Sequence, residues 1–537
     1  MANNKAKISQ KSLKRIHRSK LNTTIGLTTS IVMGVFSFIE RSIFNQYFIE
    51  DYLGLYSFFY NIIYILSFIE LGLGTSIAYA LYAPLDKNDY PQIAAIMRFF
   101  KKAYFCMGTI MIASGLILMP FLGFFIKTSI ELSEVRLYFI FFLIGNISSY
   151  YLNYKSILFN ANQEAYKITL VTNITWTLLY IVEMVISITT RNFLFYSISI
   201  FCANILKNTI LNIWATKEYS YLKTEKKSRL SGDSRKQITR NTKGLIMMKI
   251  GQVMVTSTDA LLISSMVGTA ILGKYSNYQM ISSGLLSLST LLPSSIVASL
   301  GNAGVSETKR TLSKGFNALD LSSFLIYSTL TILLLNIVNP IISTFFGADR
   351  VLSLSTVSLI CVNFYLSSMR ELFISFKTSL GLYWEDRKRP LAEGFTNLIL
   401  SIILGHFWGL DGIILGTVLT NIFINLIVEP QVIFHNGLKR STFWFYIQTI
   451  IRALLAVTIG LITVYLNSLV DFGKFIHGKI SIGSFSIPSA GLLKICTNFL
   501  TTSLIAISIL YICFRKTPEA VAIIETVKIA FKRKKTK

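Results

Sequence analysis

The sequence predicts an all-α polytopic membrane protein with fourteen transmembrane helices. Twelve of them form two six-helix lobes related by a pseudo-twofold axis along the membrane normal, and two extra helices follow at the C-terminal end. Only 15% of the residues are charged and 52% are hydrophobic, whereas a soluble chain usually carries about a quarter charged residues. Apolar runs of about 20 residues, long enough to cross a bilayer, recur along the 537 residues, and one pair of runs occurs twice.

Each expected helix is one of these apolar runs, and the number of runs determines whether the two termini lie on the same side of the membrane. The runs cover residues 22–46, 54–82, 99–125, 137–159, 168–189, 193–214, 244–267, 272–300, 317–346, 352–380, 391–408, 411–434, 443–468 and 490–514. Because the number is even, both termini are expected on the same side of the membrane.

The basic residues indicate which side this is. The N-terminal segment and alternate connections, ending with the C-terminal tail, hold 37 Lys and Arg residues, and the other connections hold 6. Cytoplasmic loops of membrane proteins carry an excess of Lys and Arg, so we expect both termini in the cytoplasm. The localisation that we expect for the chain is the plasma membrane. The same rule accounts for the net charge of +26, which in a soluble protein would suggest nucleic acid. We expect no nucleic-acid partner.

The longest internal connection, 215–243, is strongly basic and separates six predicted helices from the next six. We therefore place the boundary between the lobes there. The predicted parts are a cytoplasmic N-terminus 1–21, an N-lobe 22–214, the linker 215–243, a C-lobe 244–434, helices 13 and 14 within 435–514 and a cytoplasmic tail 515–537. Basic residues 532–535 in the tail are expected to contact acidic lipid.

The repeated pair of runs supports the two-lobed arrangement. The first pair turns through residues 52–57 and the second through 272–276, and both turns contain Leu-Gly-x-Tyr-Ser. Arg41 in the first copy and Asp259 in the second lie fifteen residues after Gly26 and Gly244. A duplicated pair with a charged group at matching depth is typical of a transporter that has a central cavity between its lobes.

Charged residues inside the predicted helices are candidates for function, since a charge in hydrocarbon costs about 2.5–3.5 kcal/mol on insertion scales. We expect an anionic substrate to be bound by cationic side chains that face a cavity, and acidic groups to balance them or to carry a coupling ion. The cationic candidates are Arg41, Lys155, Lys249, Arg370, Lys377 and Arg452, and the acidic ones are Glu70 and Asp259. The alternative is a structural ion pair between the lobes, for example Arg41 with Asp259.

Position along the helices refines these expectations. Arg370 and Lys377 are seven residues apart and share a helix face, so they form a basic stripe. Glu183 and Glu429 lie near predicted helix ends, where we expect them to be solvated.

Other chemistry finds little support. The five cysteines all lie in apolar runs and the four histidines are scattered, so we expect no disulfide framework, no metal site and no cofactor. Residues 268–274 mimic a phosphate-binding loop, but Tyr275 replaces the required Ser or Thr and no strand precedes it. The largest outer loop, 469–489, offers few groups for catalysis, so we expect a transporter and not an enzyme.

The run from Asp51 to Tyr56 resembles polysaccharide and teichoic-acid flippases of Gram-positive bacteria, the Wzx-like branch of the multidrug/oligosaccharidyl-lipid/polysaccharide (MOP) superfamily. The same holds for Glu70-Leu-Gly-Leu-Gly74 and for the run from Lys249 to Tyr278. The resemblance implies two six-helix lobes forming a V around a central cavity. It also implies that helices 443–468 and 490–514 form a groove for a prenyl tail, where Arg452 would meet the diphosphate. Tyr56-Ser57 departs from the Asn-Gly or Asn-Ser of many relatives.

The function expected from the residues and the resemblance is a flippase. It would move undecaprenyl-diphosphate-linked oligosaccharide, the repeat unit of a capsule, exopolysaccharide or teichoic-acid-type polymer, from the inner to the outer leaflet by alternating access. Membrane lipids, and a polymerase and glycosyltransferases of the same pathway, are the expected partners. The alternatives are an ion-coupled exporter of organic cations on the same scaffold and a membrane glycosyltransferase or polymerase.

Overall fold

A computed structural model of the chain describes residues 2–70, 72–225, 257–289, 309–382, 384–469, 478–482 and 485–521, with isolated residues between 232 and 255. The chain forms two compact units, Met1–Leu272 and Gly273–Lys537. The division falls downstream of the predicted linker 215–243, so the boundary of the lobes at that linker stays a prediction.

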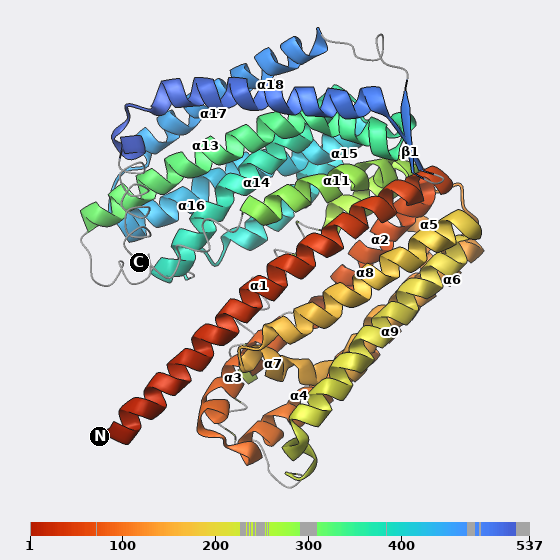
Figure 1. The fold of residues 1–537 in the computed structure, drawn as a ribbon, viewed down its shortest axis with the longest axis vertical. Helices are drawn as coiled ribbons and strands as arrows, with labels where there is room; N and C mark the ends of the chain where they lie inside the picture. Colours follow the sequence, from red (N-terminus) through yellow and green to blue (C-terminus); the bar gives the residue numbers. More distant parts are fainter. Residues whose placement is uncertain are drawn as a thin grey trace. The chain divides into compact units, whose positions relative to one another are not determined.

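Unit 1 is a bundle of helices built around the contact of α1 with α8 and of α6 with α9 (Figure 1). Its helices are α1 (Ala2–Tyr47), α2 (Glu50–Leu66), α3 (Leu73–Lys87), α4 (Tyr90–Leu118), α5 (Leu122–Phe125), α6 (Leu132–Leu152), α7 (Ile157–Ala161), α8 (Ala165–Thr189), α9 (Phe193–Glu218) and a helix at Ser257–Val267. Asn173 on α8 donates hydrogen bonds to the hydroxyls of Thr29 and Ser30 on α1, at 2.8 and 3.2 Å. These bonds fix the contact of the two helices within the apolar bundle.

The repeated motif does not form the turns that the sequence predicts. The chain breaks between α1 and α2 and again at Gly268, which has φ +128°, so residues 52–57 and 272–276 lie in the first turns of α2 and α11. Gly54 is required by packing: a Cβ on it would lie 1.9 Å from the carbonyl oxygen of Thr269, the first residue of α11. Asp51 accepts a hydrogen bond from the Thr269 hydroxyl at the same contact.

The predicted helix 54–82 is interrupted. A short 3₁₀ helix, η1 (Ser67–Glu70), follows α2, and Gly72 with φ +97° precedes α3. This positive φ is readily adopted only by glycine. The interruption places Glu70 at a helix break inside unit 1.

Unit 2 is also helical, and a short hairpin precedes its last helix. Its elements are most of α11 (Thr269–Ser289), then α13 (Lys309–Ile341), α14 (Leu354–Leu380), α15 (Arg389–Thr420), the π-helical turn η8 (Asn421–Asn425), α16 (Leu426–Val432), α17 (Phe443–Ser468), β1 (Lys479–Ile482), β2 (Phe485–Pro488) and α18 (Ser489–Phe514). The two strands are antiparallel, with Lys479 opposite Pro488. Helix α13 is central, since α14, α17 and α18 all lie against it.

Helix α15 is a helical hairpin. Gly409 has φ +57° and ψ −127°, which breaks the helix between the predicted runs 391–408 and 411–434. The two halves then pack closely, because a Cβ on Gly412 would lie 2.0 Å from the carbonyl oxygen of Leu404. Asn397 on the first half donates a hydrogen bond to Thr417 on the second at 2.9 Å.

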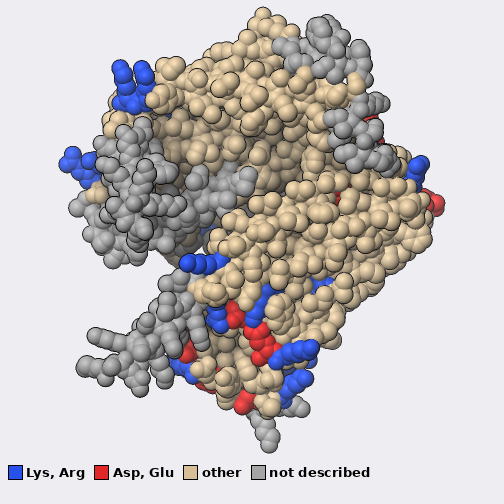
Figure 2. All heavy atoms as spheres, in the orientation of Figure 1, with Lys and Arg blue, Asp and Glu red and all other residues tan. Residues whose placement is uncertain are grey.

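In the described part of the chain, ten helices are long and apolar enough to cross a membrane, which indicates a multi-pass membrane protein. One of the ten, Arg389–Leu438, contains the hairpin at Gly409. The total of fourteen, the pseudo-twofold axis and the cytoplasmic termini stay predictions. In unit 1 the helix flanks are largely uncharged, and Lys, Arg, Asp and Glu gather at the end where α3 and α7 lie (Figure 2).

Candidate functional site

A pocket of 630 Å³ opens between helices α13, α14, α16 and α17 of unit 2. Most of its wall is apolar: α14 contributes Val362 and Leu366, and α17 contributes Ala453, Val457 and Leu461. Gly460 also lines the pocket, and a Cβ there would be in ordinary contact with Leu335, at 3.6 Å. The volume lies within the roughly 300–1,000 Å³ usual for small-molecule sites.

The charged and amide side chains of the pocket wall are Arg370, Asn421, Asn425 and Glu429. Arg370 on α14 donates two parallel hydrogen bonds to Glu393 on α15, from Nη1 to Oε1 at 2.6 Å and from Nη2 to Oε2 at 2.9 Å. Its Nε donates to Glu429 Oε1 on α16 at 3.1 Å. The guanidinium therefore joins three helices beside the pocket.

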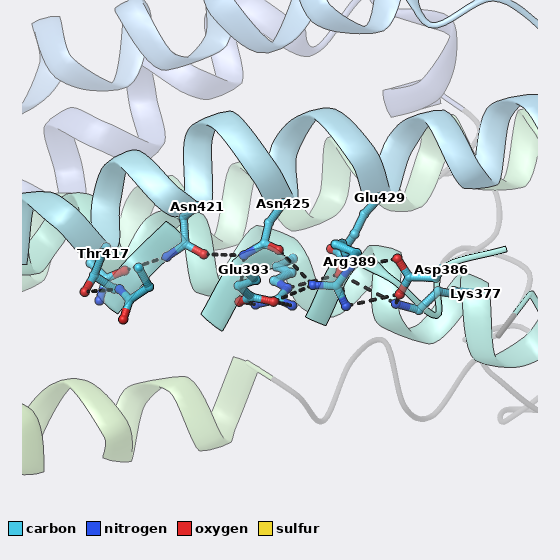
Figure 3. A network of polar contacts seen from close by, with 11 residues as sticks. Lys377, Asp386, Arg389, Glu393, Thr417, Asn421, Asn425 and Glu429 are labelled. Atoms are coloured by element: carbon cyan, nitrogen blue, oxygen red, sulfur yellow. Dashed lines mark hydrogen bonds and ion pairs between the residues drawn. The ribbon is translucent and has the colours of Figure 1, made fainter. Parts of the chain in front are cut away.

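Behind Arg370 the polar contacts continue as one network (Figure 3). Arg389 donates to Glu393 at 2.5 Å and to Asn425 at 2.8 Å, and its Nη2 lies 3.2 Å from Glu429 Oε1. Asp386 accepts hydrogen bonds from Arg389 and from Lys377. Lys377 also lies 3.6 Å from Glu429, so Arg370 and Lys377 share a helix face as the seven-residue spacing predicts.

The network balances its charge. Three cations, Arg370, Lys377 and Arg389, face three carboxylates, Asp386, Glu393 and Glu429. Burial of so many charges is tolerated only when each is paired, because an uncompensated buried charge costs several kcal/mol. The network therefore fixes the relative positions of α14, α15 and α16, and its cations are held by carboxylates.

Arg452, predicted to meet a diphosphate, lies elsewhere in unit 2. Its Nη1 contacts Asp320 Oδ2 on α13 at 2.6 Å, and its guanidinium lies 5.6 Å from the ring of Phe324. It does not line the pocket. The pocket also differs from the expected groove between helices 443–468 and 490–514, because α17 lines it and α18 does not.

Unit 1 holds a second buried polar cluster, toward the C-terminal ends of α1 and α8 and the N-terminal end of α9. Glu40 on α1 is 3% exposed and accepts a hydrogen bond of 2.8 Å from the Tyr196 hydroxyl on α9. Glu183 on α8 is 1% exposed, and it interacts electrostatically with Glu40, Tyr196 and Arg41. The Arg41 guanidinium also lies 5.8 Å from the ring of Tyr56. Arg41 thus sits beside two buried carboxylates.

The other predicted site residues are distributed over separate places. Glu70 accepts a hydrogen bond from Tyr104 on α4, and Asp259 is half-buried in the helix Ser257–Val267. Lys155 lies in a small pocket at one end of unit 1. Lys249 lies outside the described residues. A pair between Arg41 and Asp259 stays a prediction.

The prediction that Glu183 and Glu429 are solvated is wrong, since both side chains are 1% exposed. Both residues are close to the ends of their predicted helices in sequence. In the folded chain, neighbouring helices cover them and keep water away. Sequence reasoning also missed Asp386, Arg389 and Glu393 as partners of the basic stripe. The spacing of Arg389 and Glu393, four residues apart at the start of a helix, is a signal that favours an ion pair. Among the described residues, no group of three or more His, Cys, Asp or Glu side chains is placed to hold a metal ion.

No protein-family model matches the sequence, and no curated protein matches it. Solved structures are similar in fold. The lipid II flippase MurJ in an inward closed conformation is 15% identical, with a TM-score of 0.58 over 91% of this chain and 99% of that one. An inward-facing multidrug resistance MATE family transporter of the MOP superfamily is 12% identical, with a TM-score of 0.62 over 78% of this chain and 99% of that one.

A third similar structure is a mutant of the MATE transporter VcmN of Vibrio cholerae. It is 13% identical, with a TM-score of 0.52 over 79% of this chain and 99% of that one. At these identities the likeness establishes the fold alone, which this chain shares with the transporter structures named above. Membership of the Wzx-like branch stays a prediction.

Proposed function

We propose that this protein is a transporter that moves a lipid-linked oligosaccharide, carried on undecaprenyl diphosphate, from the inner to the outer leaflet by alternating access. A polar glycan does not cross hydrocarbon unaided, because each polar group that loses water without a new hydrogen bond costs several kcal/mol. A protein that offers a polar path for the glycan and an apolar surface for the lipid chain lowers this barrier. The reaction requires no covalent chemistry.

The observation that carries the proposal is the pocket of unit 2. It combines a long apolar wall on α14 and α17 with a polar edge at Arg370, Asn421 and Asn425. An isoprenoid chain fits the first, and the second offers polar side chains to a sugar group.

The extent of the structural similarity supports the same substrate class. The match to the lipid II flippase covers 91% of this chain and the match to the inward-facing MATE transporter covers 78%. The difference is about 70 residues, enough for two membrane helices of about 20 residues each and their connections. The proposed function uses α17, which lines the pocket.

The experiment that tests the proposal measures flipping by the purified full chain in liposomes. A fluorescent polyprenyl-diphosphate-linked sugar is incorporated symmetrically, and its access to an added reductant that quenches only the outer leaflet is followed with time. Val457→Trp fills the pocket from α17 and is expected to slow flipping at least tenfold. Ile462→Trp on the same helix introduces the same side chain outside the pocket and is expected to leave the rate unchanged.

Equal rates in protein-free and protein-containing liposomes would refute the proposal. Sugar transfer to a new acceptor by the purified protein would show a glycosyltransferase or polymerase instead. In cells, deletion of the gene is expected to cause lipid-linked repeat units to accumulate on the cytoplasmic leaflet.

A second candidate function, ion-coupled export of organic cations, is favoured by one observation in unit 1. Two buried carboxylates, Glu40 and Glu183, lie near each other beside Arg41, and a pair of carboxylates is suited to hold a proton or a cation. Efflux of a fluorescent organic cation driven by a proton or sodium gradient, abolished by Glu40→Gln, would support this function. Gradient-independent flipping with no cation efflux would exclude it.

A further inference from the structure

A second, smaller pocket of 150 Å³ lies in unit 1, between α4, the segment after α6 and the segment after α9. It is separate from the pocket of unit 2, and nothing in the proposed transport cycle uses it. Its cationic lining residues are Arg98 and Lys101 on α4, Lys155 in the short 3₁₀ helix Tyr154–Ser156, and Lys223 at the end of the 3₁₀ helix Ser220–Lys223.

The side chains of this pocket are held in place by neutral groups. Lys155 Nζ donates a hydrogen bond of 2.5 Å to the Thr216 hydroxyl, which in turn donates to the Asn212 carbonyl oxygen at 2.6 Å. The ammonium groups of Lys155 and Lys101 both lie over the ring of Tyr154, at 5.7 and 5.9 Å from its centre. One aromatic ring therefore faces two positive charges.

The charges of the pocket repel one another. Burial lowers the pKa of Lys155, and the neighbouring charges of Lys101 and Lys223 lower it further. The described residues that line the pocket include no Asp or Glu. Arg98 donates a hydrogen bond to the backbone carbonyl oxygen of Glu225. The charges that repel one another are therefore those of the three lysines, Lys101, Lys155 and Lys223.

We propose that this pocket binds a phosphate group, carried either by an anionic phospholipid of the surrounding leaflet or by a soluble phosphorylated molecule. A phosphate offers several acceptor oxygens to the donors that surround the pocket. It also relieves the repulsion among Lys101, Lys155 and Lys223. Basic pockets between membrane helices on the cytoplasmic side are a known type of site for lipid head groups.

The size and place of the pocket fit this ligand. A volume of 150 Å³ is several times the roughly 30 Å³ that a water molecule occupies in the liquid, yet below the roughly 300–1,000 Å³ of sites for larger ligands. A single phosphate group therefore fits better than a glycan. The segments that form the pocket, around residues 98–101, 154–155 and 216–223, adjoin connections that the positive-inside rule predicts to be cytoplasmic, where lipid phosphates and soluble phosphates are both present.

The experiment uses the purified full chain in two arms. In the first, nanodiscs of phosphatidylcholine are doped with phosphatidylglycerol, and the lipid retained by the protein is measured by native mass spectrometry. In the second, nanodiscs of phosphatidylcholine alone are titrated with inorganic pyrophosphate, and stabilisation against heat is followed, because a ligand that binds the folded state raises its stability.

The double variant Lys101→Gln/Lys223→Gln is expected to weaken binding about thirtyfold, roughly fivefold for each lysine removed. Both side chains are exposed, so the variant is expected to fold. Lys155→Gln, tested separately, is expected to weaken binding about fivefold. The matched control, Lys102→Gln/Lys217→Gln, removes two exposed lysines beside the pocket that do not line it, and is expected to change affinity less than twofold.

The arms identify the source of the phosphate. If the pocket variant binds more weakly only in the phosphatidylglycerol arm, the ligand is a lipid head group. If it binds more weakly only in the pyrophosphate arm, the ligand is soluble. Weaker binding in both arms indicates that the pocket selects the phosphate group itself. The proposal is overturned when neither ligand binds saturably, or when the control variant weakens binding as much as the pocket variant.

Discussion

Replacing Glu393 by glutamine removes one of the three carboxylates from the buried network of unit 2. The Glu393 carboxylate accepts four hydrogen bonds: two from Arg370, one from Arg389 and one from Asn425. Glutamine keeps one acceptor oxygen and turns an NH₂ group toward guanidinium donors. The network then holds three cations and two carboxylates.

The expected cost follows from the burial of these groups. The side chains of Glu393 and Arg389 are each 6% exposed and that of Arg370 is 21% exposed, so water compensates little for the lost charge. Removal of one member of a buried pair costs about 3–5 kcal/mol. For a domain of the size of unit 2 this corresponds to a fall of roughly 6–20 °C in Tm.

The assay is thermal unfolding of the purified chain in detergent, for Glu393→Gln, Arg370→Gln and the double variant. The double variant removes one charge of each sign, so Lys377 and Arg389 still face Asp386 and Glu429. We expect its destabilisation to fall at least about 2 kcal/mol short of the sum of the single variants, since residues in one network are not additive. Additive effects, or a loss below about 1 kcal/mol for Glu393→Gln, would refute the reasoning.

Two further predictions concern packing and charge. Gly54→Ala is expected to destabilise unit 1 by about 3 kcal/mol or more, because its Cβ would clash with the backbone of Thr269. The control is Gly26→Ala, whose Cβ would meet nothing within 4 Å. Equal Tm values for the two variants would contradict the prediction. Arg452→Met is expected to cost about 3–5 kcal/mol, since it leaves the buried carboxylate of Asp320 without its cation. Adding Asp320→Asn is expected to restore much of the lost Tm, and no recovery would indicate a role for Arg452 in packing alone.

The helices themselves were largely predictable because apolar runs of membrane length are a strong signal. The break between the runs 391–408 and 411–434 coincides with Gly409, whose φ of +57° ends the first half of α15. The interruption at Gly72 was not predicted, although a break inside an apolar run requires only one backbone angle that glycine adopts readily. The composition of a segment shows that it is apolar, but it does not show whether the segment forms one uninterrupted helix.

The role of Gly54 shows a second limit. The sequence places it in a repeated turn motif, and the structure places it in the first turns of α2, against Thr269. Glycine serves turns and close helix contacts equally well, so only the position of a residue more than two hundred positions away distinguishes the two. The motif occurs twice in the sequence, and in both places the sequence analysis assigned it to the wrong local geometry.

The charged residues were found by sequence, but their surroundings were not. Spacing predicts correctly that Arg370 and Lys377 share a face, since both contact Glu429. Spacing along one helix carries no information on α15 and α16, which supply Glu393 and Glu429. A stripe that looks basic in sequence is therefore neutral in the folded chain.

This neutrality changes where an anion is expected to bind first. An anion that approaches Arg370 must compete with Glu393 and Glu429, which already hold both edges of the guanidinium; it gains Coulomb energy only if those pairs open. The pocket around Lys155 requires no such exchange, since its lining in the described chain is cationic without a carboxylate. Of these two pockets, the one around Lys155 therefore offers an anion the more cationic lining. At the pocket of unit 2, the apolar wall on α17 contributes more to recognition than charge does, and for this reason a bulky side chain at Val457 is a sharper test of transport than the removal of Arg370.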